Sequence, residues 1–221
     1  GIVFDNASTS AYQAALSTYT WSHRIGTGGA NRVLIVGVSI FATGTVSSIT
    51  YNTVALTLIR SDATGVYRSE LWQLVAPATG SNDVVVTLSA SVTSISNAQS
   101  YTAVDQTTPI DANNGLTGSN TPASGSVTPA TNATRVVGNL SASSASGVVS
   151  ATGQAPRTSN AGALGTGASD DKGIIDTAAS TTLTWNGLGA LDTWAVSLAA
   201  LRPVSAISQI FNKLMMMMGI G

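Results

Sequence analysis

Short runs of β-branched and aromatic residues recur along the whole chain of 221 residues. The runs are rich in Val, Ile, Thr, Tyr and Trp, and clusters of Gly, Asn, Asp, Pro and Ser separate them. Runs of this kind are typical of strands, and the clusters are typical of turns. The pattern predicts an all-β protein. We expect strands at about residues 2–5, 17–24, 32–41, 46–51, 54–60, 67–74, 83–88, 93–104, 135–142, 147–152, 172–175, 181–185 and 191–201.

Two of these runs indicate how the strands pack. Residues 17–24 alternate, so that Tyr19, Trp21 and His23 share one face. Residues 32–41 read RVLIVGVSIF, a nearly continuous apolar run that suits a strand covered on both faces. Between the predicted strands at residues 46–51 and 54–60, Asn52 is the residue best able to adopt a positive φ in a hairpin turn. We therefore expect a sandwich of two antiparallel sheets.

Two stretches carry weak strand signals. Residues 105–134 are dense in turn formers and predict either a long loop or a pair of irregular edge segments. Residues 143–171 are rich in Ala, Ser and Gly. No repeat of fixed period is visible, which argues against a solenoid or a propeller. We expect one sandwich domain over residues 1–203 and a separate tail over residues 204–221.

The tail is the most apolar part of the chain and ends in ISQIFNKLMMMMGIG. Its large apolar residues follow helical spacing and need a cover: a neighbouring copy, the chain's own domain or a membrane. A bilayer span needs ~20 apolar residues, and Ser208, Gln209, Asn212 and Lys213 interrupt this segment, so we favour a neighbouring copy. The expected interface residues are Ile207, Ile210, Phe211, Leu214, Met215, Met216, Met217 and Met218, with Ile2, Val3 and Phe4 as a second candidate donor.

The low charge of the chain also favours association. Charged residues make up 9% and the formal net charge is −1, whereas about a quarter of residues are charged in average proteins. Nucleic-acid binding needs clustered Lys and Arg, so this composition argues against it. A nearly neutral surface of Ser, Thr, Asn and Gly suits a lattice, a filament or a glycan coat, and equally an ordinary secreted domain.

The inventory of reactive residues argues against an enzyme. Glu70 is the only Glu, so a pair of catalytic Glu residues is impossible, and its neighbour Arg68 predicts an ion pair. The single histidine, His23, lies on the face of Trp21, which predicts a packed or hydrogen-bonded side chain. With no Cys and one His, a structural zinc site cannot be filled.

No cofactor is expected, although calcium stays open as an alternative because two loops carry suitable oxygen ligands. The loop residues are Asp111, Asn113 and Asn114, followed by Gly115, and then Asp170, Asp171 and Asp176. Clusters of this kind are more often plain Asx turns.

Sugar binding and glycosylation have candidates of their own. Trp185 lies at a strand-to-turn junction and is the best candidate for an exposed aromatic platform, while the other three Trp residues belong to apolar strands. Sequons for N-glycosylation occur at Asn6, Asn132 and Asn139. They acquire meaning only if the protein is extracellular.

A set of segments in a fixed order resembles a known type of module. The segments are Trp21-Ser22-His23, NRVLIVGVS from residue 31, VSSITYN from residue 46, Glu70-Leu71-Trp72, APATG from residue 76 and VVVTL from residue 84. Together they resemble jelly-roll modules, similar to concanavalin A, of uncharacterised secreted bacterial and phage structural proteins. Those modules place Gly after the turn Asn, whereas Thr53 follows Asn52 here. The resemblance implies a jelly roll with a surface or structural role and no enzyme activity.

The sequence therefore predicts a non-enzymatic structural subunit. Its apolar tail would join copies of the chain into an extracellular or cell-surface filament, resembling a pilus, or into a virion surface layer. The alternative is a carbohydrate-binding module of a secreted or tail-fibre protein. The expected partners are copies of the chain itself, with glycans as a second class.

Overall fold

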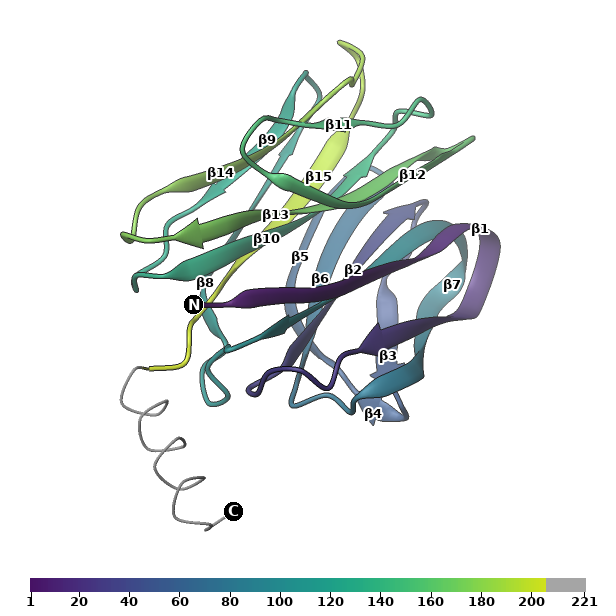
Figure 1. The fold of residues 1–221 in the computed structure, drawn as a ribbon. Helices are drawn as coiled ribbons and strands as arrows, with labels where there is room; N and C mark the ends of the chain where they lie inside the picture. Colours follow the sequence, from purple (N-terminus) through teal and green to yellow (C-terminus); the bar gives the residue numbers. More distant parts are fainter. Residues whose placement is uncertain (206–221) are drawn as a thin grey trace, which may run out of the picture.

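The computed structural model describes residues 1–205, and antiparallel strands make up all their regular structure (Figure 1). The first half of the chain contains β1 (Val3–Ile25), β2 (Val33–Phe41), β3 (Val46–Tyr51), β4 (Val54–Ala55), β5 (Thr57–Thr64), β6 (Tyr67–Val75) and β7 (Gly80–Thr102). The second half contains β8 (Ile110–Gly118), β9 (Ala123–Val127), β10 (Thr134–Ala142), β11 (Val149–Ser150), β12 (Ala155–Gly162), β13 (Gly165–Ile175), β14 (Thr181–Asn186) and β15 (Trp194–Leu201). The all-β prediction is confirmed.

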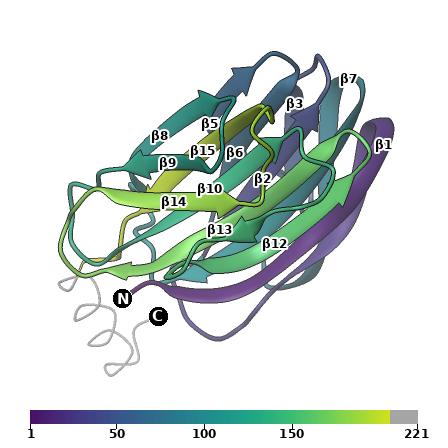
Figure 2. The same cartoon turned by 90° about the horizontal axis from the view of Figure 1, so that it is seen from above.

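The strands form three sheets rather than the two that the sequence predicted. The sheets are β4-β3-β7-β2-β6-β5 with β1 added to β7, then β12-β13-β10-β15-β8, and finally β11-β14-β9. Figure 2 shows how they stack as layers. The first sheet curls because β1 and β7, each 23 residues long, bend and run through two layers. The described residues therefore form a layered β-sandwich with more than the two layers of the predicted sandwich.

The pairing shows that the two halves are built in the same way. In the first half β7 pairs with β1, β2 and β3, while β6 pairs with β2 and β5. In the second half two strands, β14 and β15, correspond to the long strand β7, and two others, β8 and β9, correspond to the long strand β1. Strand β10 corresponds to β2, β11 to β3, β12 to β5 and β13 to β6. This duplicated topology is invisible as a sequence period. A single domain over residues 1–203 stays a prediction.

The halves pack face to face through β2 and β10, which run in the same direction. Ser39 Oγ donates to the Leu140 carbonyl oxygen at 2.7 Å, and Ser141 Oγ donates to the Ile40 carbonyl oxygen at 3.1 Å. On one side β6 contacts β15 and β5 contacts β8; on the other β7 contacts β13 and β1 contacts β12. An approximate two-fold axis along the strands therefore relates the halves. We call the end of the molecule that holds Gly1 and Val204 the near end. The opposite end, which holds the β5–β6 and β12–β13 turns, is the far end (Figure 1).

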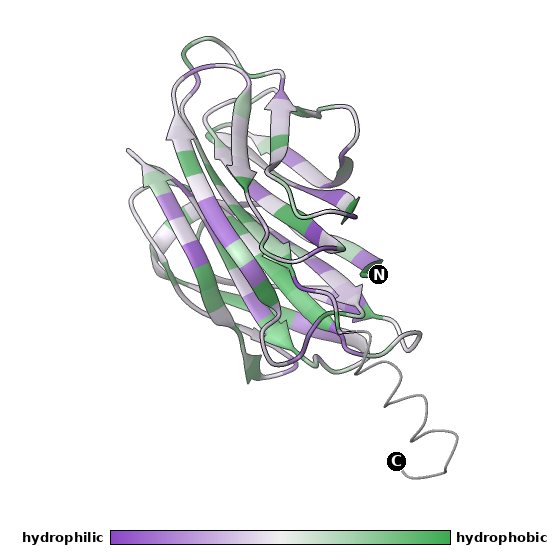
Figure 3. Cartoon of the chain, turned by 90° about the vertical axis from the view of Figure 1, so that its left-hand side faces the viewer, coloured by the Kyte–Doolittle hydropathy of each residue, from purple (hydrophilic) through white to green (hydrophobic). Residues whose placement is uncertain are grey.

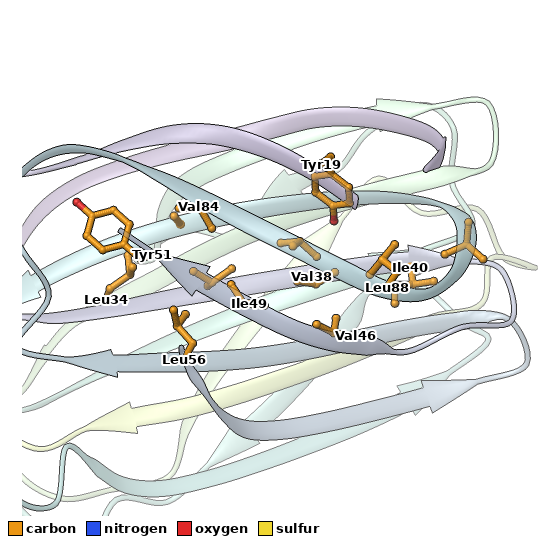
Figure 4. Close-up of a cluster of buried hydrophobic side chains, with 14 of the residues drawn as sticks. Tyr19, Leu34, Val38, Ile40, Val46, Ile49, Tyr51, Leu56, Val84 and Leu88 are labelled. Atoms are coloured by element: carbon orange, nitrogen blue, oxygen red, sulfur yellow. The ribbon is translucent and has the colours of Figure 1, made fainter. Parts of the chain in front are cut away.

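Three apolar clusters fill the layers. One lies inside the curled first half (Figure 4), one between the two smaller sheets, and one between the halves. Strand β2 serves two of them, because Leu34 and Val36 face the first cluster while Val33 and Ile35 face the third. All residues of β2 are buried, which confirms the strand covered on both faces. Other strands alternate between hydrophobic and hydrophilic residues (Figure 3).

The weak stretches of the sequence fold into edge strands. Residues 105–134 contain β8 and β9, which lie at the edges of their sheets, as the second alternative predicted. Residues 143–171 contain β11, β12 and most of β13, far more strand than the sequence indicated. Small residues are tolerated there because neighbouring strands lie close: a Cβ on Gly165 would be 2.6 Å from the Phe41 ring.

Candidate functional site

The chain leaves the second half at the near end through residues 202–204, the tail root. The Arg202 N–H donates to the Pro109 carbonyl oxygen at 2.8 Å, and the Val204 N–H donates to the Ala103 carbonyl oxygen at 3.0 Å. These acceptors belong to the linker between the two halves. The root is therefore tied to the body of the molecule, and the apolar tail begins from a fixed place.

Asp111 holds the tail root from β8. Its side chain is fully buried, and its carboxylate lies 2.7 Å from Arg202 Nη2. Burial raises the pKa of this carboxyl, but hydrogen bonds from the N–H groups of Thr131 and Ala130, together with Arg202, outweigh burial and lower it. Asp111 therefore stays ionised at neutral pH and binds protein donors instead of a free cation.

A surface hollow of about 470 Å³ lies beside the tail root. Its lining residues are Gly1, Asp105, Thr131, Ala133, Arg202, Pro203, Val204 and Ser205. The chain therefore passes into the tail at an open surface and not inside one of the three apolar clusters.

The predicted donor residues of the tail, Ile207 to Met218, lie outside the described residues, and their role stays a prediction. The second candidate donor is engaged in its own fold. Ile2 is buried between the halves, and Val3 pairs with Thr102 although its side chain is 59% exposed. Phe4 packs edge-to-face on Tyr101. Residues 2–4 would have to leave their own sheet to join a neighbour, so we retain the tail as the donor.

The prediction of an exposed Trp185 is wrong. Its side chain is fully buried between the two smaller sheets, and its indole N–H donates to Asp170 Oδ1 at 3.1 Å. The strand-to-turn junction faces inward here because β14 is covered by β10 and β15. Trp194 is also buried, whereas Trp21 and Trp72 are partly exposed.

The three sequons differ in accessibility. Asn139 is fully buried between the halves, so it cannot carry a glycan in the folded protein, and that prediction is corrected. Asn6 is partly exposed and donates a hydrogen bond to the Arg24 carbonyl oxygen, whereas Asn132 is exposed and accepts one from the Ala178 N–H. Glycosylation at these two residues stays a prediction.

Several side chains of the two candidate calcium loops bond to protein groups. In the first, Asn113 accepts a hydrogen bond from Arg60, while Asn114 donates to the Ser126 carbonyl oxygen. In the second, Asp171 is bound by Arg157 at 2.6 Å. Within residues 1–205 no three His, Cys, Asp or Glu side chains gather into a metal site. These contacts occupy part of the oxygen ligands that a cation would need.

His23 occupies a buried, hydrogen-bonded position, as predicted, and Glu70 forms the predicted ion pair with Arg68 but is buried in the inner strand β6 instead of lying at an edge. His23 Nδ1 lies 2.8 Å from Ser8 Oγ and Nε2 lies 3.2 Å from Ser100 Oγ, which donates to Asp5. Burial lowers the pKa of His23 to about 4, against a smaller opposing effect of Asp5. Burial raises the pKa of Glu70, which lies 3.8 Å from Arg68.

Sequence reasoning missed the tail root. The only signal for it was Pro203 directly after the last strand, which marks an end but does not reveal Asp111 as the partner of Arg202.

No protein-family model, curated protein or solved structure matches this chain. In residues 1–205 there is no helix long and apolar enough to cross a membrane.

Proposed function

We propose that this protein is a non-enzymatic structural subunit that self-assembles through its apolar tail. One observation carries the proposal: a strongly apolar segment follows a root that is fixed at the surface. Among residues 1–205 the three apolar clusters are built from residues 2–201, and the root lies beside an open hollow. A neighbouring copy can cover the tail, because burial of apolar surface stabilises association by ~25 cal/mol per Å².

The assembly is proposed to be an extracellular or cell-surface filament or a virion surface layer. The outer faces of β1 and β7 support this, because Thr18, Thr20 and Ser22 are exposed there beside Asp83 and Thr87. Such a hydroxyl-rich, weakly charged coat has little charge repulsion between close neighbours. A jelly-roll topology, implied by the resemblance, remains part of the proposal.

Electron microscopy of full-length variants tests the tail directly. Phe211→Asp combined with Leu214→Asp places charge on the predicted apolar face, and the control, Ser208→Asp with Asn212→Asp, places equal charge on polar positions. Filaments or ordered particles are expected for the unmodified chain and the control, and none for the apolar-face variant. Monodisperse monomers in all three samples, or ordered assemblies in all three, would contradict the proposal.

A carbohydrate-binding module remains the alternative, now at a different place. A polar hollow of about 330 Å³ lies over β3 and β7. It is lined by Thr50, Asn52, Thr53, Ser81, Asn82, Asp83 and Val85. These side chains can bond sugar hydroxyls, but none of them is an aromatic platform. Binding on a glycan array that is lost with Asp83→Ala, by a chain that stays monomeric, would favour this alternative.

A further inference from the structure

An apolar strip crosses the far end of the molecule, opposite the tail root. It consists of Tyr12, Phe41, Val66, Tyr67 and Leu164, and we call it the far-end strip. The Phe41 and Tyr67 rings lie 6.4 Å apart, and Gly165, next to Leu164, lies against Phe41. The Leu164 N–H lies 3.3 Å from Tyr12 Oη, which accepts its hydrogen bond. These contacts join both halves, so the strip is continuous across the two-fold axis.

The strip is open to solvent at its two turn residues. Val66 is 40% exposed in the β5–β6 turn, and Leu164 is 48% exposed in the equivalent β12–β13 turn. The turn sequences, ATGVY over residues 63–67 and AGALG over residues 161–165, contain no charged residue. At the same end, the bent part of β1 exposes Leu16 (40%), and the loop before β15 exposes Leu191 (93%). Exposed apolar groups gathered at one end mark an interaction surface.

We infer that the far-end strip is the acceptor for residues 207–218 of a second copy, so that copies join head to tail along the two-fold axis. This inference rests on the proposed function. The root of the donor segment and the acceptor strip lie at opposite ends of one molecule, and such a contact repeats without closing when its rotation does not close. The result is a polar filament in which each near end meets the far end of the next copy.

The tail that occupies the far-end strip belongs to a second copy, because the chain's own tail, as a helix, is too short to reach the strip from the near end. Strand β2 passes from the near end to the far end in nine residues, which corresponds to ~30 Å. Residues 206–218, if they form the predicted helix, span ~20 Å. The tail of a stacked neighbour, in contrast, begins directly opposite the strip.

The chemistry of the two partners is complementary. The tail carries Phe211 and four successive Met residues, and flexible thioether side chains pack well against irregular aromatic surfaces. Tyr12 and Tyr67, which are partly exposed, provide such a surface beside the buried Phe41. No charged side chain belongs to the strip, so insertion buries no charge of the acceptor.

Mixing two full-length variants tests the polarity. The acceptor variant carries Val66→Asp and Leu164→Asp with an intact tail. The donor variant carries Phe211→Asp and Leu214→Asp with an intact far end. Neither is expected to polymerise alone, and a mixture is expected to stop at one-to-one pairs in sedimentation and mass photometry. The matched control is Val54→Asp, at a near-end residue of β4 that is 52% exposed, and this variant should still polymerise.

Each outcome separates the inference from the proposed function. If the donor variant fails to assemble but the acceptor variant assembles like the unmodified chain, the tail is the donor and the far-end strip is not its acceptor. If the donor variant also assembles normally, both proposals fall. The native chain has no Cys, so Leu164→Cys mixed with Met216→Cys should form an inter-chain disulfide, and Val54→Cys with Met216→Cys should not. The reverse pattern would overturn the inference.

Discussion

At the scale of single residues, His23 couples stability to pH. Its ring is fully buried and bonded to Ser8 and Ser100. Trp21 donates to Ser8, which donates to His23 Nδ1; His23 Nε2 donates to Ser100, which donates to Asp5. A neutral ring with its proton on Nε2 satisfies every one of these hydrogen bonds. Protonation adds a donor where Ser8 already donates, and it places charge in a low-dielectric site. The ring therefore resists protonation in the folded state.

We expect acidification to destabilise the protein through His23. The unfolded side chain titrates near pH 6.5 and the folded one at about 4. The contribution of His23 to the free energy of unfolding is therefore at its full value above pH 6.5. It falls as the pH drops from 6.5 to about 4 and changes no further below about 4. The free energy of unfolding should fall by about 2.5 kcal/mol between pH 7 and pH 4.5.

Denaturant titration of the native protein and of His23→Gln at both pH values measures this contribution. Glu70 and Asp170, whose pKa burial raises, oppose it equally in both proteins. The variant should lose most of the pH dependence. An equal loss in both proteins would assign it to other groups.

At the scale of elements, the β3–β4 hairpin shows a strained residue in a well-defined turn. Tyr51 and Val54 pair across a two-residue turn in which Asn52 has φ 47° and Thr53 has φ 65°. Both values belong to the left-handed region, which suits a two-residue hairpin. Asn tolerates it, whereas a β-branched Thr is strained there. The predicted positive φ of Asn52 is confirmed, and the turn remains tight without the Gly of the resembled modules.

Thr53→Gly should therefore stabilise the protein by about 0.5 to 1 kcal/mol, because relief of strain exceeds the added entropy of the unfolded chain. Thr57→Gly, in the regular strand β5, serves as the control and should destabilise. Chemical denaturation of both variants measures the difference. A loss of stability in Thr53→Gly would show that the turn carries no strain.

At the scale of the whole molecule, Asn139 joins the two halves. Its Oδ1 accepts from Asn97 at 2.7 Å, and its Nδ2 donates to Ser69 at 2.9 Å. The side chain fills the space over Gly37, where a Cβ would lie 2.5 Å from Oδ1. The equivalent strands β2 and β10 thus carry a glycine and an asparagine facing each other. The interface is specified by this complementarity as well as by its apolar cluster.

We expect Asn139→Ala to lower the free energy of unfolding by about 3 kcal/mol, because Asn97 and two buried serines lose a partner. Thr20→Ala, on an exposed face, should change it by less than about 0.5 kcal/mol. Thermal and denaturant unfolding measure both. A loss below about 1 kcal/mol for Asn139→Ala would show that water replaces the missing amide.

Residue-level patterns in the sequence determined the all-β class, the strand covered on both faces at residues 32–41, the φ of Asn52, the packed side chain of His23 and the ion pair between Glu70 and Arg68. These depend on near neighbours along the chain, and the periodicity of two is itself local. The third sheet, the duplicated halves and β12 and β13 were decided by pairing between distant residues, whose small side chains carry no local strand signal.

The candidate sites divide in the same way. The apolar tail is plain in the sequence because its composition alone is unusual. Trp185 and Asn139 were misplaced because burial depends on which layer covers a strand, and local pattern does not contain that information. The far-end strip exists only in three dimensions, since Tyr12, Phe41 and Leu164 come from strands and turns that the packing of the two halves brings to one end.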